Sequence, residues 1–113
     1  MSFDIIILKP TEVSVSDIST VEDAVPLGTT ESVSAAFYGA FPACVGGVFS
    51  SGDDYSVELV LSGEPVESAH LALRYGQSWS EKSERQFFSL LSSVCHSLGG
   101  VAFAVSDNSR VAP

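Results

Sequence analysis

Positive charge is scarce in this chain of 113 residues, which holds 5 Lys and Arg against 14 Asp and Glu and has a formal net charge of −9. No Lys or Arg occurs between Pro10 and Leu73. Such a field repels nucleic acid and anionic membranes and speeds the encounter with a basic protein. We therefore expect a basic protein partner, and no binding of nucleic acid or of a membrane. The alternative is that an acidic surface serves solubility alone.

Cysteines and long apolar runs are also scarce. The two cysteines, Cys44 and Cys95, do not form a CxxC motif, so we expect two reduced thiols, with Cys95 in the core. Apolar runs such as Ile5–Leu8 are far too short to span a bilayer, and the N-terminus lacks the features of a signal peptide. We expect a soluble, cytoplasmic protein whose residues 1–113 form a single α+β domain.

Signatures of catalysis, metal binding and nucleotide binding are missing. The Gly-Gly pairs fit neither GxGxxG nor GxxxxGK[ST] spacing. Asp53 and Asp54 lie in a glycine-containing turn, but the alternate oxygen ligands and closing glutamate of a calcium loop are absent. Cys95 and His96 diverge by about 100° on a helix, so they cannot form a dyad with each other. We expect no enzyme, no catalytic residue, no metal and no cofactor.

The clearest pattern lies between Gln77 and Asp107. Apolar residues recur at helical spacing from Phe87 to Leu98, which predicts a long amphipathic helix. Its N-cap is Ser78, in a capping box with Glu81, or Ser80, which is equally well placed.

Gly99 and Gly100 end this predicted helix, because glycine accepts the left-handed conformation of a C-terminal cap. The following residues, 101–105, are apolar throughout, which is typical of a central strand covered on both faces.

Upstream, the pattern predicts a strand over Phe3–Leu8 and a short helix. The helix begins after Thr29 or Thr30 and stops at Pro42. Residues 11–27 are expected to form a loop with one or two helical turns. Residues 43–54 are expected to form a loop, or at most a weak edge strand through Val48 and Phe49.

Residues 55–62 and 68–75 alternate between apolar and polar side chains, which predicts a hairpin with one buried and one wet face. Because both apolar sets are odd-numbered, the connecting loop must hold an odd number of residues, three or five. The wet face should carry Glu58, His70 and Arg74, with Glu58 directly or diagonally opposite His70.

The element order β-α-β-β-α-β predicts a ferredoxin-like two-layer sandwich, an antiparallel sheet with two helices on one face. We expect the first and last strands in the middle and the hairpin strands outside. The central strands appear apolar on their second face too, which either residues 11–28 or another molecule must cover.

The runs VPLGTTESVSAAFYGAFP and YSVELVLSGEPVESAHLALRYG resemble small stand-alone bacterial proteins with a PLG turn, a helix ending in proline and an acidic hairpin strand. These proteins are mostly uncharacterised, so the resemblance implies a fold more than an activity. It covers about the middle half of the chain and departs at VGGVFSSGD. The matching positions are Pro26, Leu27, Gly28, Pro42, Glu58, Glu64, Pro65 and Val66.

Size, acidity and the missing active site are also similar to those of immunity proteins of bacterial toxin systems. That likeness implies a binding protein that neutralises a basic, nuclease-type toxin. The predicted contact residues are Asp53, Asp54, Glu58, Glu64 and Glu67, with Trp79 as an apolar anchor, although Trp79 can instead pack the start of the long helix.

The alternative function is a small ligand-binding or enzymatic domain that uses Glu58, His70 and Arg74 on a sheet face or in a dimer cleft. A deep pocket around His70 would favour this alternative, and a flat acidic surface would favour the inhibitor. The expected assembly is a monomer or a homodimer.

Overall fold

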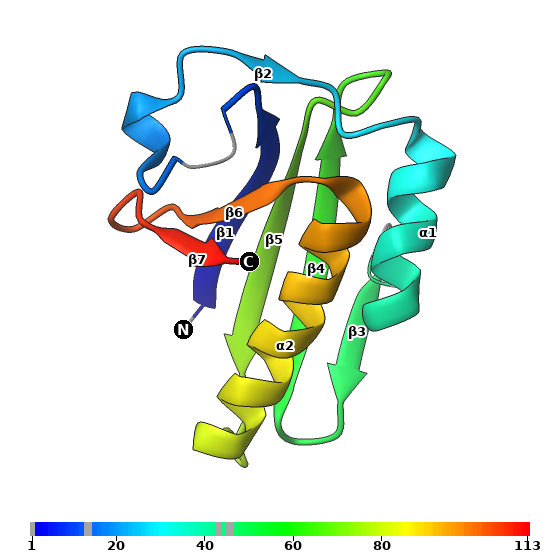
Figure 1. Ribbon diagram of the computed structural model, residues 1–113. Coiled ribbons are helices and arrows are strands. Elements are labelled where there is room, and N and C mark those ends of the chain that lie inside the picture. The colour runs from blue at the N-terminus through cyan, green and yellow to red at the C-terminus, as the bar shows by residue number, and fades with distance from the viewer. Residues whose placement is uncertain (1, 13–14, 43, 45–46) are drawn as a thin grey trace.

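An antiparallel sheet and two α-helices make up the computed structural model, which describes residues 2–12, 15–42, 44 and 47–113 (Figure 1). The described strands are β1 (Ser2–Pro10), β2 (Ala24–Val25), β3 (Val48–Ser51), β4 (Tyr55–Ser62), β5 (Ser68–Tyr75), β6 (Val101–Ala104) and β7 (Arg110–Ala112). The helices are α1 (Thr30–Ala40) and α2 (Glu81–Leu98), and a 3-10 turn, η1, covers Ile18–Thr20. The predicted α+β class is confirmed. Among these helices none is both long and apolar enough to cross a membrane.

The seven-stranded sheet has the order β3-β4-β5-β1-β6-β7, and β2 pairs with the end of β1. The prediction that the first and last strands lie between the two hairpin strands is wrong. β4 and β5 pair along their whole length, from Tyr55 opposite Tyr75 to Ser62 opposite Ser68, so no strand can lie between them. The hairpin therefore occupies one side of β1, and the predicted strand count was too low because β2 and β7 are too short to leave a pattern.

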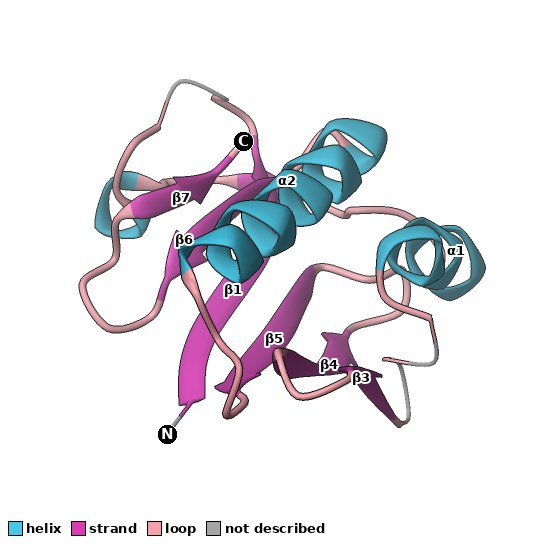
Figure 2. Cartoon of the chain, turned by 90° about the horizontal axis from the view of Figure 1, so that it is seen from below, coloured by secondary structure: helices cyan, strands magenta, loops and turns pink. Residues whose placement is uncertain are grey.

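Both helices lie on one face of the sheet (Figure 2). The predicted alternation of the hairpin is confirmed, because Val57, Leu59, Leu71 and Leu73 are all buried toward the core. The loop between β4 and β5, residues 63–67, has the predicted odd length of five. Side chains of the even-numbered residues therefore lie on the opposite face of the sheet.

Helix α2 begins two residues later than the capping box of Ser78 and Glu81 predicted. Ser80 is the N-cap and accepts a hydrogen bond from the amide of Ser83, whereas the amide of Ser78 donates to the carbonyl of Asp53. Ser78 is thus held by the β3–β4 turn, and the alternative with Ser80 is the correct one. At the other end Gly99 adopts φ 67°, as predicted for a left-handed cap.

Helix α1 also follows its pattern. Thr29 caps it by accepting a hydrogen bond from the amide of Ser32, and the helix stops at Phe41, directly before proline. The Phe41 ring lies 5.5 Å from that of Phe87, so an aromatic contact joins the two helices over the sheet.

The second face of the sheet is covered at its β6 end by the chain itself. Phe103 pairs with Ile6 on the face turned away from the helices, yet it is 0% exposed. The segment around η1 lies over it: the amide of Ile18 donates to Asn108, and that of Arg110 donates to Ser16. The predicted helical turn in residues 11–27 is thus confirmed as a 3-10 turn, and its role is to cover this end of the sheet.

Two Asp-x-Ser turns stabilise the contact between the segment around η1 and the chain before β7. Asp17 accepts hydrogen bonds from the amide and hydroxyl of Ser19, and Asp107 does the same for Ser109. These hydrogen bonds lower the pKa of both carboxyl groups below the ordinary value of 3.8. An isolated bridge between Asp17 and Ser109 brings the two turns together.

The predicted weak edge strand through Val48 and Phe49 is present as β3. Residues 43, 45 and 46 of the predicted loop lie outside the described residues. Both cysteines are buried, as expected for Cys95, and burial raises the pKa of the Cys95 thiol to about 11.

Candidate protein-binding surface

The predicted contact residues fall in three separate places. Glu64 and Glu67 lie at the turn between β4 and β5, and Asp53 and Asp54 lie at the turn between β3 and β4, at the opposite end of the sheet. The eight residues of β4, at about 3.3 Å each, separate the two turns by roughly 23 Å. Glu58 lies between them in β4. The predicted set is therefore not one continuous surface.

One end of the sheet gathers carboxylates from three segments, and we call this surface the acidic rim. The segments that carry it, β2, the start of α1 and the β4–β5 turn, lie along the top of Figure 1. All its carboxylates are exposed, and it consists of Glu22, Asp23, Glu31, Glu64 and Glu67.

The backbone between β2 and α1 builds the rim. Pro10 of β1 pairs with Ala24, which sets the start of a segment that crosses the end of the sheet. Leu27 is buried and its amide donates to the carbonyl of Val66 at 2.7 Å, while the amide of Val66 donates to Gly28 at 2.8 Å. The buried leucine and this pair of hydrogen bonds hold the crossing segment against the hairpin turn.

A side-chain hydrogen bond connects the start of α1 to the β4–β5 turn within the rim. The hydroxyl of Thr30 donates to Oε2 of Glu64 at 2.6 Å. Glu31 follows in the first turn of α1, where the helix dipole favours a carboxylate. The hairpin turn and the helix start are therefore fixed relative to each other.

The rim also exposes two apolar residues, Val25 and Pro26, which lie in the chain between Asp23 and Glu31. We call this pair the apolar step. Val25 is 40% exposed and Pro26 is exposed. Lys9 of β1 pairs with Val25, but its side chain extends toward the end of α2, where a Cβ added at Gly99 would lie 3.5 Å from its Nζ. There its charge is attracted to the carbonyl end of the helix.

Sequence reasoning missed Glu22, Asp23, Glu31 and the apolar step as parts of the candidate site. The acidic character of these residues was visible in the sequence. These residues lie at the same end of the sheet as Glu64 because of the two-residue strand β2 and the bridge between Gly28 and Val66. No sequence pattern predicts either of these two features.

Trp79 lies with Asp53 and Asp54 at the other end of the molecule. Its ring packs against Tyr55 at 5.8 Å, edge to face, and against Tyr75 at 4.9 Å. Lys82 shares a hollow with Asp54 there, so this end carries charges of both signs. Trp79 thus packs the start of α2, which is the alternative role that the sequence suggested for it.

Beside these ends, the sheet has an open face on strands β1, β3, β4 and β5, which we define by Asp4, Val48, Glu58, Val60, His70 and Arg74. Glu58 lies opposite Ala72 and diagonal to both His70 and Arg74, as the sequence predicted for His70. The carboxylate pairs with Arg74, with 2.9 Å between Nη1 and Oε2.

His70 instead lies near Asp4, which sequence reasoning had not included. Its Nε2 is 3.7 Å from Oδ1, beyond hydrogen-bonding distance, and both side chains are about half exposed. A carboxylate that does not hold the imidazole cannot orient it as a general base. The open face therefore has the residues of the alternative function but not its geometry.

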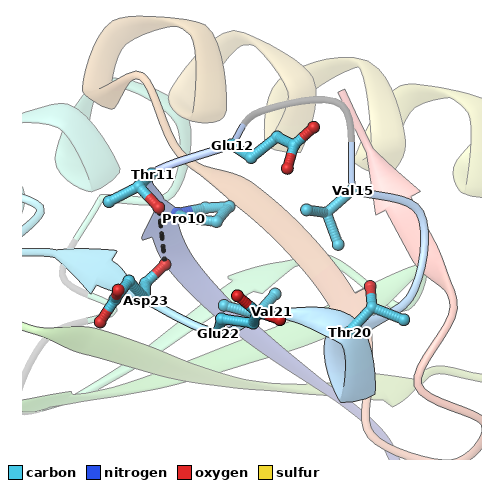
Figure 3. A pocket seen from close by; sticks show the side chains of 8 residues that line it. All are labelled: Pro10, Thr11, Glu12, Val15, Thr20, Val21, Glu22 and Asp23. Atoms are coloured by element: carbon cyan, nitrogen blue, oxygen red, sulfur yellow. Dashed lines mark hydrogen bonds between the residues drawn. The ribbon is translucent and has the colours of Figure 1, made fainter.

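Two residues of the rim, Glu22 and Asp23, also line a hollow of about 200 Å³ inside the loop between Pro10 and Asp23 (Figure 3). Its lining is mostly polar, and the hydroxyl and amide of Thr11 both donate to the carbonyl of Asp23. Across the described residues, no group of three or more His, Cys, Asp or Glu side chains is arranged to hold a metal ion.

No protein-family model, curated protein or solved structure matches this chain. Function is therefore inferred from its surface chemistry.

Proposed function

We propose that this chain is a small acidic binding protein that neutralises a basic protein partner, of the kind represented by immunity proteins against nuclease-type toxins. The observation that carries the proposal is the acidic rim: five exposed carboxylates around the apolar step of Val25 and Pro26. No Lys or Arg occurs in the segments that form it.

The composition of the rim suits protein binding. Interfaces combine an apolar centre with a polar periphery, and carboxylates at the periphery steer a cationic partner and raise its association rate. A nuclease carries cationic groups where it binds phosphates, so a surface of carboxylates competes for the same groups. The proposed partner is therefore a basic domain that presents an apolar side chain among its cations.

The ligand-binding or enzymatic alternative through Glu58, His70 and Arg74 is less well supported. These side chains lie on a sheet face and are about half exposed, and none of them lines any of the four described hollows. Small-molecule sites usually enclose most of the ligand surface. A sheet face with none of these hollows beside it favours contact with a protein.

The same proposal extends to the type of fold. Strands β4, β5, β1 and β6 with both helices are assigned to a ferredoxin-like core, and β2, β3 and β7 are additions at its edges. The order of these four strands and the common face of the helices support this assignment.

The test compares two double charge reversals that alter net charge equally, Glu64→Lys with Glu67→Lys in the rim, and Asp53→Lys with Asp54→Lys at the opposite end. The tagged chain is used to isolate a basic protein from native lysate, and binding and nuclease activity are then measured with the purified partner. We expect the rim variant to associate about tenfold more slowly at low salt, and the control variant to stay within about twofold of the wild type.

Raising the salt concentration should weaken the wild-type complex and reduce the difference between the two variants. If both double variants slow association equally, the overall field and not the rim attracts the partner. If the isolated partner binds equally well at low and high salt, or keeps its activity in the complex, the proposed function is wrong.

A further inference from the structure

The open face differs in charge from the rest of this acidic molecule. Asp4 and Glu58 lie beside His70 and Arg74, so each carboxylate has a basic side chain next to it. With His70 protonated the four charges sum to zero, and with His70 neutral they sum to −1. A basic partner drawn by the rim gains little from such a face, and a second copy of this acidic chain is repelled least here.

The open face also exposes apolar surface. Val60 is 57% exposed in β4, next to His70 across the β4–β5 pair. Val48 of β3 is 53% exposed and lies next to Glu58 across the β3–β4 pair. These are the two largest exposed fractions among the large apolar side chains of the described residues. Apolar side chains between alternating charges are typical of a surface that binds another folded surface.

We propose that the open face binds the open face of a second copy of this chain, giving a two-fold symmetric dimer. A two-fold interface brings the same patch together from both copies, so the patch must be complementary to itself. Paired charges of both signs meet this requirement, whereas the acidic rim does not. This inference stands independently of the proposed partner of the rim.

The strand register suggests where the symmetry axis lies. An axis parallel to the strands, above the boundary of β4 and β5, places β4 of one copy over β5 of the other. Val60 then faces His70 of the second copy. Glu58 faces Ala72 of the second copy, two residues along the strand from that copy's Arg74 and on the same face. Each Glu58 thus lies between two Arg74 side chains, its own and that of the other copy.

The size of the face limits the strength of the dimer. Four strands about 4.8 Å apart and five residues of about 3.3 Å each give a footprint of roughly 14 by 17 Å. Interfaces that bury less than about 1,200 Å² in total are typical of weak or transient complexes. We therefore expect a reversible dimer that forms with rising concentration.

Sedimentation velocity of the full chain from about 5 to about 500 µM tests this, a range suited to weak association. The wild type should shift from monomer to dimer. Val60→Asp should stay monomeric across the range, and the matched control Tyr38→Asp, on an exposed position of α1, should dimerise like the wild type. A monomeric wild type at the highest concentration, or a Val60→Asp variant that dimerises normally, would overturn the proposal.

A charge swap keeps the proposal testable if Val60→Asp fails to fold, which circular dichroism would detect. Glu58→Arg places like charges together within and between copies and should abolish the dimer. Adding Arg74→Glu restores both kinds of pair and should restore the dimer to within about threefold of the wild-type affinity, since a reversed pair has the same Coulomb attraction. Failure of the double variant to recover dimerisation would contradict the proposed contact.

Discussion

At the scale of single residues, Gly76 fixes the position of the β3–β4 turn against the end of β5. Its amide donates to the carbonyl of Asp54, and a Cβ at this position would overlap the carbonyl oxygen of Asp53. The backbone of the turn therefore approaches closer than any other residue type allows. The sequence contains the glycine, but the contact that requires it depends on tertiary structure.

Replacing Gly76 with alanine should lower the free energy of unfolding by about 1–3 kcal/mol or more, because backbone atoms must move to admit the new methyl group. Gly39 provides a matched control, because nothing lies within 4 Å of a Cβ added there and it lies inside α1. Gly39→Ala should raise the free energy of unfolding by about 0.5–1 kcal/mol. Urea denaturation of both variants measures the difference, and equal effects would refute the close approach.

Asp17 and Asp107 make stability depend on pH in the acid range. Their hydrogen bonds to Ser19 and Ser109 hold the folded-state pKa of each below 3.8. In the unfolded chain the pKa returns to its ordinary value, so their stabilising effect is present above pH 3.8 and is lost as pH falls through the folded-state pKa.

Asp17→Asn retains a side-chain oxygen for Ser19 but removes the charge that strengthens the hydrogen bond. We expect the variant to be less stable than the wild type at pH 7, and the two to converge as pH falls through the folded-state pKa of Asp17, which lies below 3.8. Thermal unfolding monitored by circular dichroism across this range makes the comparison. A difference that stays constant with pH would mean that ionisation of Asp17 contributes nothing.

At the scale of elements, periodicity predicted both helices and the hairpin, because each has a buried face long enough to repeat. Continuous apolar runs predicted the first and last strands of the sheet core. It did not predict the order of the strands. That order depends on which strands pair, and β1 pairs with β5, with Ile5 opposite Leu71 and Phe3 opposite Leu73. Apolar strands are compatible with more than one partner and register, so the sequence pattern alone does not select this pairing. β2 and β7 hold two and three residues and have no period.

Phe87 links the elements of the core. Its ring lies 5.5 Å from Phe41, which follows α1, and 5.6 Å from Tyr55 of β4. Phe87→Ala should lower the free energy of unfolding by about 3–5 kcal/mol through lost burial and the resulting cavity. Phe88, next to it on α2, is only partly buried, so Phe88→Ala should cost clearly less. Equal losses in chemical denaturation would show that Phe87 is not the centre of this packing.

At the scale of the whole molecule, the charge is distributed unevenly over three surfaces. Carboxylates gather at the acidic rim, the opposite end mixes Asp54 with Lys82, and the open face pairs its charges. The sequence predicted the overall acidity and two of the rim residues, Glu64 and Glu67. It could not predict how the carboxylates between Pro10 and Leu73 would divide among these surfaces, because that division follows from the direction in which each strand and turn leaves the sheet.

The rim is assembled from segments that lie more than 30 residues apart in the chain, as the hydrogen bond from Thr30 to Glu64 illustrates. It is a discontinuous epitope, and no short linear peptide copied from this chain reproduces it. A partner that recognises the rim consequently recognises only the folded chain and draws the folding equilibrium toward it. The partner would therefore protect this chain from degradation for as long as the complex lasts.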